Sequence, residues 1–313
     1  MTALTSTLTR RTALMAGAAL PLTAALAGTA RAATDTQTAT PAPLHNGFAI
    51  GDMAVSTLLA GTRAVPDPHK IFGLNVSDED FAAASKQAFI PDDIAQFFFT
   101  PTVVKTGDQV VLFDTGADSD GMTAALAAAG YAPGDITTVV ITHMHGDHIG
   151  GLMKDGTPTF PDATYVTGQT EFDHWSKTDN DTFKTKVAPL ADRFSFIGDG
   201  DSPVSGITAM AAFGHTPGHM VYHLESDGDR LLLMADTANH YVWSLAHPDW
   251  EVTFDMDKAK AAETRRKVLD MVAADRIPLV GYHMPFPGLG FVETRGDGFH
   301  YVPETYQMRL KNA

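Results

Sequence analysis

Seven consecutive positions concentrate side chains that bind metals: Thr142-His143-Met144-His145-Gly146-Asp147-His148. Imidazole nitrogens and carboxylate oxygens are donors that zinc and similar first-row metals accept. The apolar, β-branched run at 137–141 directly precedes this segment and predicts a buried strand that ends in a polar loop. A loop at a strand end can direct several donors at one point. The spacing therefore favours a metal site over a solvated, histidine-rich turn.

Three further donors each follow a predicted strand later in the chain: His215, within Gly214-His215-Thr216-Pro217-Gly218-His219, then Asp236 and His283. Together with the first segment they make seven donors, which is too many for one ion with four or five ligands. They are enough for two ions if Asp236 bridges them. A water held between two cations loses its proton near neutral pH and becomes a nucleophile, so no serine nucleophile is needed.

Strands and helices are expected to alternate around these donors. Apolar strands are predicted at 101–105 and 109–113, a helix at 122–129, the longest helix at 258–274 and a last strand at 278–281, whereas 61–68 predicts a turn. Strand, helix and strand joined by short links are typical of α/β proteins. Because donors follow strands in both halves and no linker divides them, we expect two sheets within one domain at 46–313.

The absence of cysteine and the net negative charge exclude several kinds of site and partner. Cysteine is absent, which excludes disulfides, thiolate ligands and a cysteine nucleophile, so a metal site must use histidine and carboxylates. The formal net charge of −15 argues against nucleic acid and anionic membrane surfaces as partners.

The first 32 residues predict a signal peptide of the twin-arginine type. Arg10 and Arg11 precede a weakly apolar stretch, and Ala30-Arg31-Ala32 provides a cleavage site between small residues. A membrane anchor is the alternative, but Pro21 and the many small residues make a poor span. Residues 33–45 predict a flexible leader. We expect a periplasmic or secreted protein with no stable membrane span after cleavage.

The donor segments resemble the metallo-β-lactamase-fold hydrolases, and within them the methyl parathion hydrolase and lactonase-like group. The resemblance rests on the segments at 142–148 and 214–219, the strand ends at Asp236 and His283, the turn at 113–116, and the tail at 286–290. It implies an α/β fold: an αββα four-layer sandwich in which two mixed β-sheets are flanked by helices.

The same resemblance assigns the donors to two divalent ions. His143, His145 and His215 would hold one, Asp147, His148 and His283 the second, and Asp236 would bridge them. Asp147 and Asp236 are the expected catalytic carboxylates, since Asp147 would also orient the hydroxide. Zinc is favoured, although manganese, cobalt and iron suit the same donors.

Other residues are assigned more loosely. Trp175 and Phe183 are expected on the wall of a substrate pocket, as is Asn239, which stands where quorum-quenching lactonases carry a tyrosine. His219 is expected to be structural, because seven other donors already complete two ions. The aromatic run at 97–99 fits either core packing or a pocket wall.

The expected activity is hydrolysis of a small lactone or ester by attack of a metal-bridging hydroxide on the carbonyl carbon, with organophosphate triester hydrolysis as a neighbouring activity. The alternatives are a β-lactamase, which the bridging Asp236 argues against, a mononuclear iron enzyme resembling persulfide dioxygenases, and a metal-loaded binding protein without catalysis. The sequence leaves a homodimer open.

Overall fold

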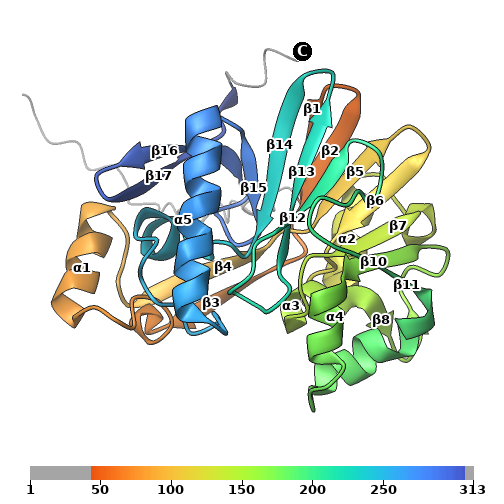
Figure 1. The fold of residues 1–313 in the computed structure, drawn as a ribbon, viewed down its shortest axis with the longest axis horizontal. Helices are drawn as coiled ribbons and strands as arrows, with labels where there is room; N and C mark the ends of the chain where they lie inside the picture. The colour runs from red at the N-terminus through yellow and green to blue at the C-terminus, as the bar shows by residue number, and fades with distance from the viewer. Residues whose placement is uncertain (1–43, 307–313) are drawn as a thin grey trace, which may run out of the picture. The chain divides into compact units, whose positions relative to one another are not determined.

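The computed structural model describes residues 44–306, which fold around two large β-sheets (Figure 1). The seven-stranded sheet has the order β1 (His45–Ile50), β2 (Met53–Leu58), β5 (Thr102–Thr106), β6 (Gln109–Phe113), β7 (Thr138–Ile141), β10 (Thr164–Gly168) and β11 (Phe194–Ile197). The six-stranded sheet has the order β12 (Ile207–Ala211), β13 (Met220–Ser226), β14 (Asp229–Ala235), β15 (Leu279–Gly281), β16 (Leu289–Arg295) and β17 (Gly298–Pro303). Both sheets contain parallel and antiparallel pairs.

Two small ribbons lie outside these sheets: β3 (Gly61–Pro66) with β4 (Ile94–Phe99), and β8 (Met153–Lys154) with β9 (Thr157–Pro158). The α-helices are α1 (Asp78–Gln87), α2 (Ser119–Ala128), α3 (Gly146–Ile149), α4 (Gln169–Trp175) and α5 (Lys258–Asp275). Shorter helical turns are η1 (Pro68–Lys70), η2 (Pro133–Asp135), η3 (Gly150–Leu152), η4 (Phe183–Val187), η5 (Ala188–Arg193) and η6 (Tyr241–Ala246).

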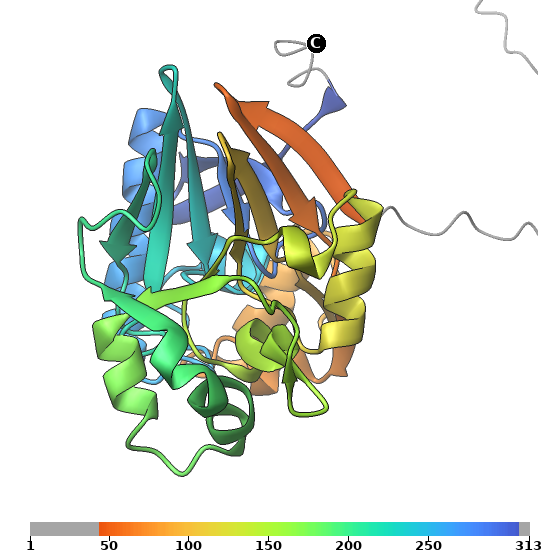
Figure 2. The same cartoon turned by 90° about the vertical axis from the view of Figure 1, so that its right-hand side faces the viewer.

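The two-residue period of the strands separates the layers. In β7, Val140 belongs to the core between the two sheets, whereas Val139 and Ile141 belong to the core shared with α2. Helix α2 lies on this outer side of the seven-stranded sheet (Figure 2). Its Met122 and Leu126 are fully buried in that outer core. A strand that is apolar on both faces is therefore covered on both faces, as expected for the centre of a sandwich.

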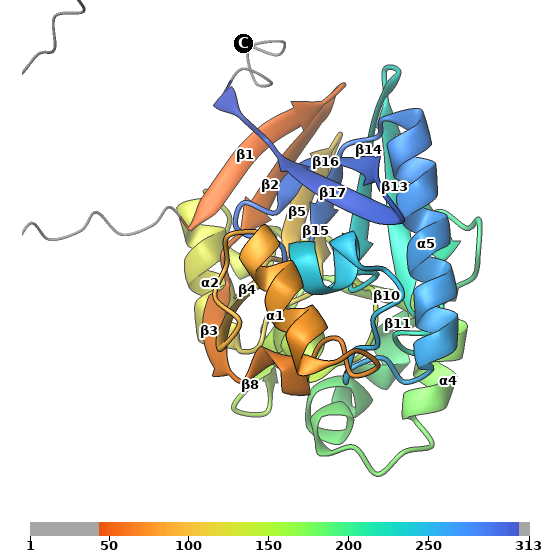
Figure 3. The same cartoon turned by 90° about the vertical axis from the view of Figure 1, so that its left-hand side faces the viewer.

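Helix α5 covers the outer face of the six-stranded sheet (Figure 3). Its residues Val268, Leu269 and Val272 pack with Val221 of β13 and Leu232 of β14. The order of layers is thus helix, sheet, sheet, helix, which confirms the predicted αββα sandwich.

A fourth core lies away from the sandwich, beneath the β3–β4 ribbon. Phe97 of β4 packs there with Phe72, with Phe81 of α1 and with Trp243 of η6. The segment predicted as a turn at 61–68 therefore contains strand β3, whose main chain pairs with β4 along its whole length.

The two ends of the described chain differ from the sequence prediction. The strand at 279–281 is not the last, because β16 and β17 follow it as a hairpin. His45 begins β1 and is thus not part of a flexible leader. The predicted signal peptide and the rest of the predicted leader up to residue 43 lie outside the described residues. Within residues 44–306, no helix has both the length and the apolar character needed to cross a bilayer.

Replacing Leu126 by alanine should lower the free energy of unfolding by about 2–5 kcal/mol, because it opens a cavity in the core between α2 and the sheet. Urea unfolding followed by circular dichroism, at a fixed metal concentration, measures this. The matched control is Leu74→Ala, since Leu74 is 41% exposed. A loss in the control as large as in Leu126→Ala would contradict the assigned layering.

Candidate metal centre

Four strand ends from two sheets bring the predicted donors together. His143, His145, Asp147 and His148 follow β7 of the seven-stranded sheet, whereas His215, Asp236 and His283 follow β12, β14 and β15 of the six-stranded sheet. They form two groups, in each of which one donor atom per residue lies within 4.8 Å of the others. The first contains His143, His145, His215 and Asp236, and the second contains Asp147, His148 and His283.

In the first group the imidazole nitrogens face one another closely. His145 Nδ1 lies 3.2 Å from His143 Nε2 and 3.0 Å from His215 Nε2. Asp236 Oδ2 completes the group at 3.3 Å from His215 Nε2. Nitrogen atoms gathered in this way around one point suit a shared cation.

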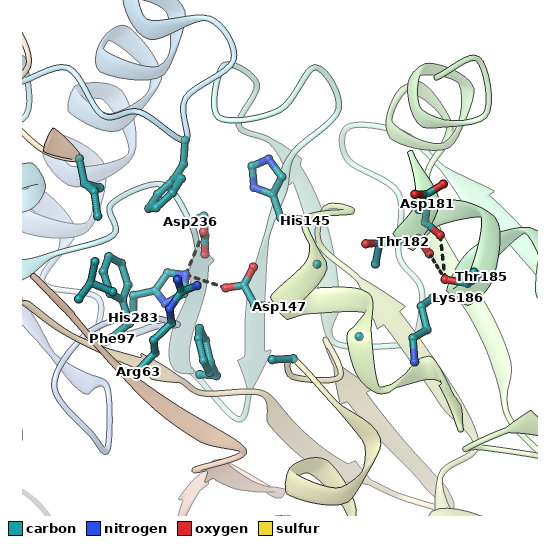
Figure 4. A pocket seen from close by; sticks show the side chains of 17 residues that line it. Arg63, Phe97, His145, Asp147, Asp181, Thr182, Thr185, Lys186, Asp236 and His283 are labelled. Carbon is teal, nitrogen blue, oxygen red and sulfur yellow. Dashed lines mark hydrogen bonds and ion pairs between the residues drawn. The ribbon is translucent and has the colours of Figure 1, made fainter. Parts of the chain in front are cut away.

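Asp236 also reaches the second group. Its Oδ1 lies 3.2 Å from His148 Nε2, and its Oδ2 lies 3.2 Å from His283 Nε2. Asp147 Oδ2 lies 3.3 Å from the same nitrogen of His283 (Figure 4). One buried carboxylate thus stands between two sets of donors, which is the geometry expected of a bridging ligand.

Two atoms of this cluster have no hydrogen-bond partner among the described residues, although both are buried: His148 Nε2 and Asp236 Oδ1. Buried polar atoms without a partner are rare and costly in native proteins. A divalent cation between the two groups would satisfy both atoms at once. The donor set therefore fits two metal ions.

The other ring nitrogen of each of three histidines is bound by an acceptor that fixes the ring. His148 Nδ1 donates to Asp114 Oδ2 at 2.8 Å, His215 Nδ1 to Asp255 Oδ1 at 2.9 Å, and His283 Nδ1 to the carbonyl oxygen of Phe98 at 2.9 Å. With Nδ1 bound in this way, Nε2 of each ring faces the centre. Such outer contacts set both the tautomer and the orientation of a metal ligand.

Burial and the neighbouring carboxylates shift the pKa values of the histidine donors in opposite directions. Burial is the larger cause, and the positive charge of His215 the second, of a fall in the pKa of His145 to about 3. Burial alone would also lower the pKa of His215, but its hydrogen bonds with Asp236 and Asp255 outweigh burial and raise that pKa to about 9. The carboxylates therefore favour positive charge at this centre, which bound cations would supply.

Glu171 is a residue that the sequence analysis missed. It is fully buried at the start of α4, and each oxygen accepts two hydrogen bonds. Oε1 accepts from the Met144 amide at 2.9 Å and from Trp175 Nε1 at 2.7 Å, and Oε2 accepts from Thr216 Oγ1 and the Gly218 amide, both at 2.8 Å. One carboxylate thus joins the loop after β7 to the loop after β12.

Asp255 is a second residue that the sequence analysis missed, and it pairs with Arg265. Arg265 donates to Asp255 Oδ2 at 2.6 Å, and both side chains are 1% exposed. Arg265 also binds the carbonyl oxygens of Thr237 and Pro248, each at 2.8 Å. Arg265 thus supports the carboxylate that orients His215.

A cavity of about 870 Å³ opens over the donors. One wall is apolar, from β3, β4 and neighbouring loops, and the opposite wall is polar, from the segment at 181–186 (Figure 4). His145, Asp147, Asp236 and His283 reach its floor. Phe97 and Phe99 line the apolar wall, and Phe97 also lies in the fourth core, so both alternatives considered for this run apply to it.

The three predicted pocket residues do not line this cavity. Trp175 is buried with its indole N–H bound to Glu171, and Phe183 packs against Phe172 in the outer core. Asn239 is buried and donates from Nδ2 to Asp236 Oδ2 at 2.9 Å. His219, as predicted, serves the fold: Nδ1 donates to the Ala212 carbonyl oxygen, and Nε2 accepts from the Asp236 amide.

Comparison with known proteins agrees with this fold and these donors. Residues 100–283 match the model of the metallo-beta-lactamase superfamily, and the chain belongs to that family. Two solved structures are similar over 85% of this chain and 99% of theirs, each at 25% identity. They are AidC, a dizinc quorum-quenching lactonase in complex with a product, at a TM-score of 0.76, and the hydrolase AbOPH, at 0.79.

Curated relatives match a shorter stretch. The probable metallo-hydrolase YybB of Bacillus subtilis is 29% identical over 140 residues, which are 42% of this chain and 59% of YybB. The N-acyl homoserine lactonase AttM of Azorhizobium caulinodans is 27% identical over 143 residues, which are 40% of this chain and 51% of AttM. The chain thus spans about half the length of these two relatives.

Replacing Glu171 by glutamine should weaken metal binding at the first group by about 10–100-fold, because the amide cannot accept from all four donors that position the two ligand loops. Competition with a chromogenic chelator measures the affinity of each ion. The control is Glu263→Gln on the exposed face of α5, which should bind metal as the wild type does. Unchanged affinity at both ions in Glu171→Gln would refute this role.

Proposed function

We propose that the protein is a dinuclear metal-dependent hydrolase that opens small lactones or esters. The observation that carries this proposal is Asp236, which lies between two groups of donors at the floor of an open cavity. Two groups favour a dinuclear centre over the mononuclear iron alternative. The relatives support the same class, since AidC is a dizinc lactonase and AttM is an N-acyl homoserine lactonase.

Seven side chains would hold the two ions: His143, His145 and His215 one, Asp147, His148 and His283 the other, with Asp236 shared. Divalent ions bound there would supply Lewis acidity toward a carbonyl oxygen and a nucleophilic water near neutral pH. Zinc is the metal that we favour, on the donor set and on the dizinc neighbour.

The chain's own residues would order the reactants. Asp147 is only half-buried, with 28% of its side chain accessible, so it can reach both a water and a bound substrate. Its backbone carbonyl oxygen accepts from Tyr282 Oη at 2.5 Å, and the Tyr282 ring stacks on His148. Asp147 would thus be held over the floor of the cavity and orient the attacking water.

The two walls suggest how a substrate lies. The apolar wall would contact an acyl or alkyl part of the substrate. The polar wall would face the polar part of the substrate, on the side that is open to water. Organophosphate triesters are a second substrate class that we keep, because their hydrolysis also places negative charge between two cations. Twin-arginine export, cleavage near residue 32 and a homodimer remain predictions from the sequence.

Removing metal with a chelator should lower the turnover of an N-acyl homoserine lactone by at least about 100-fold, and two equivalents of zinc should restore it. Dihydrocoumarin, methyl paraoxon and nitrocefin complete the substrate panel. Asp236→Asn should abolish binding of the second equivalent, because one bridging oxygen is lost.

Asp229→Asn, at the far end of the same strand β14, is the matched control and should retain both ions. Hydrolysis that survives complete metal removal would rule out the proposal. One iron per chain without hydrolysis would move the protein to the oxygenase alternative.

A further inference from the structure

The β3–β4 ribbon presents one charged side chain to the cavity. Arg63 of β3 is directly opposite Phe97 of β4 in the antiparallel register, so the two side chains leave the same face of the ribbon. The Phe97 ring meets the His283 ring edge-on at 5.5 Å, and the Phe99 ring does so at 5.8 Å. The face that carries Arg63 is therefore turned toward the second group of donors.

Arg63 has no side-chain partner in the part of the chain that the structure describes. Among residues 44–306 no hydrogen bond or ion pair to its guanidinium is present, and the same holds for Arg276, which does not line the cavity. The other arginines there are engaged: Arg193, Arg230, Arg265, Arg266 and Arg295. Val65, Ile71 and Phe254 line the same wall, and the Arg63 side chain is itself exposed to solvent. Because it is exposed and lines the cavity, its guanidinium can be reached by a ligand that enters there.

The opposite wall differs. Lys186, which Figure 4 shows across the cavity from Arg63, donates from Nζ to the carbonyl oxygen of Met153 at 2.7 Å. Asp181 lies on the same side as Lys186 and also lines the cavity. Of the lysine and arginine side chains that line the cavity within the described residues, Arg63 is thus the one without a hydrogen bond, and it lies beside apolar residues.

We propose that Arg63 binds a carboxylate on the substrate, remote from the bond that is cleaved. This rests on the proposed hydrolase function and specifies its substrate class: a lactone or ester that carries an acidic arm. A guanidinium binds a carboxylate through two parallel hydrogen bonds, which fixes the direction of the arm as well as its charge.

The negative charge of the whole chain means that an anionic substrate must be selected by a nearby cation such as Arg63. A formal net charge of −15 repels anions at long range, but such repulsion between exposed charges is screened beyond about 8 Å at physiological ionic strength. Within that distance the substrate would meet Arg63 and the metal ions. An acidic arm would therefore be selected by direct contact and not by long-range steering.

Two series of probes test the proposal. The first contains homoserine lactones acylated with succinyl, glutaryl or adipoyl arms, each prepared as the terminal acid and as the terminal carboxamide of equal size. The zinc-loaded protein should prefer the acid at the best arm length by at least about tenfold in kcat/KM, and Arg63→Gln should bring that ratio close to one. The second series contains the corresponding lactams, which are not hydrolysed, and calorimetry should show the same dependence in Kd.

Lys186→Met is the matched control, because it removes one positive charge from the opposite wall and should preserve the preference for the acid. Equal kcat/KM and Kd for acid and carboxamide at every arm length would overturn the carboxylate assignment, as would a preference that survives Arg63→Gln. If no lactone is hydrolysed but the lactam acids still bind through Arg63, the hydrolase proposal fails and the carboxylate site stands.

Discussion

The structure depends on a carboxylate that is buried where a lone negative charge could not persist. Asp236 is 3% exposed and lies within 3.3 Å of three imidazoles, those of His148, His215 and His283. Burying an unpaired charge is costly, so the surrounding chain must supply positive charge. Although burial alone would raise the pKa of Asp236, His283 and His148 outweigh it and hold that pKa well below its usual range.

The need for positive charge around Asp236 explains why strands from both sheets end at one place. Neither sheet carries enough donors alone, and the two loops that hold them are tied by Glu171 and by the hydrogen bond from the Met220 amide to the Thr142 carbonyl oxygen. Local backbone strain accompanies the arrangement. Ala235, directly before Asp236, has a φ of 43°, and Asp114, which holds His148, has a φ of 59°. Left-handed backbone at residues other than glycine is often found at functional sites, where the surroundings impose it.

The metal donors could be predicted because short stretches of sequence around each one identify it. Four of them occupy 143–148, and the others directly follow apolar strands, so type and spacing sufficed. Glu171 and Asp255 could not be found in this way, because Glu171 is defined by contacts with residues up to 47 positions away and Asp255 by one 40 positions away. An acid between apolar neighbours, as in Phe254-Asp255-Met256, was the available signal. Strand β3 was wrongly predicted as a turn because Pro66 and the exposed residues of the strand hide the two-residue period.

The β3–β4 ribbon has a consequence for how this molecule can change over generations. Within residues 44–306 its strands pair only with each other, and its buried side chains pack in a core of their own with α1 and η6. Substitutions on its cavity face therefore leave the hydrogen-bond ladders of both large sheets intact. Substitutions on this separate surface can therefore alter which substrates fit, while the metal donors stay in place. Substrate preference is thus expected to diverge among related proteins sooner than the reaction type.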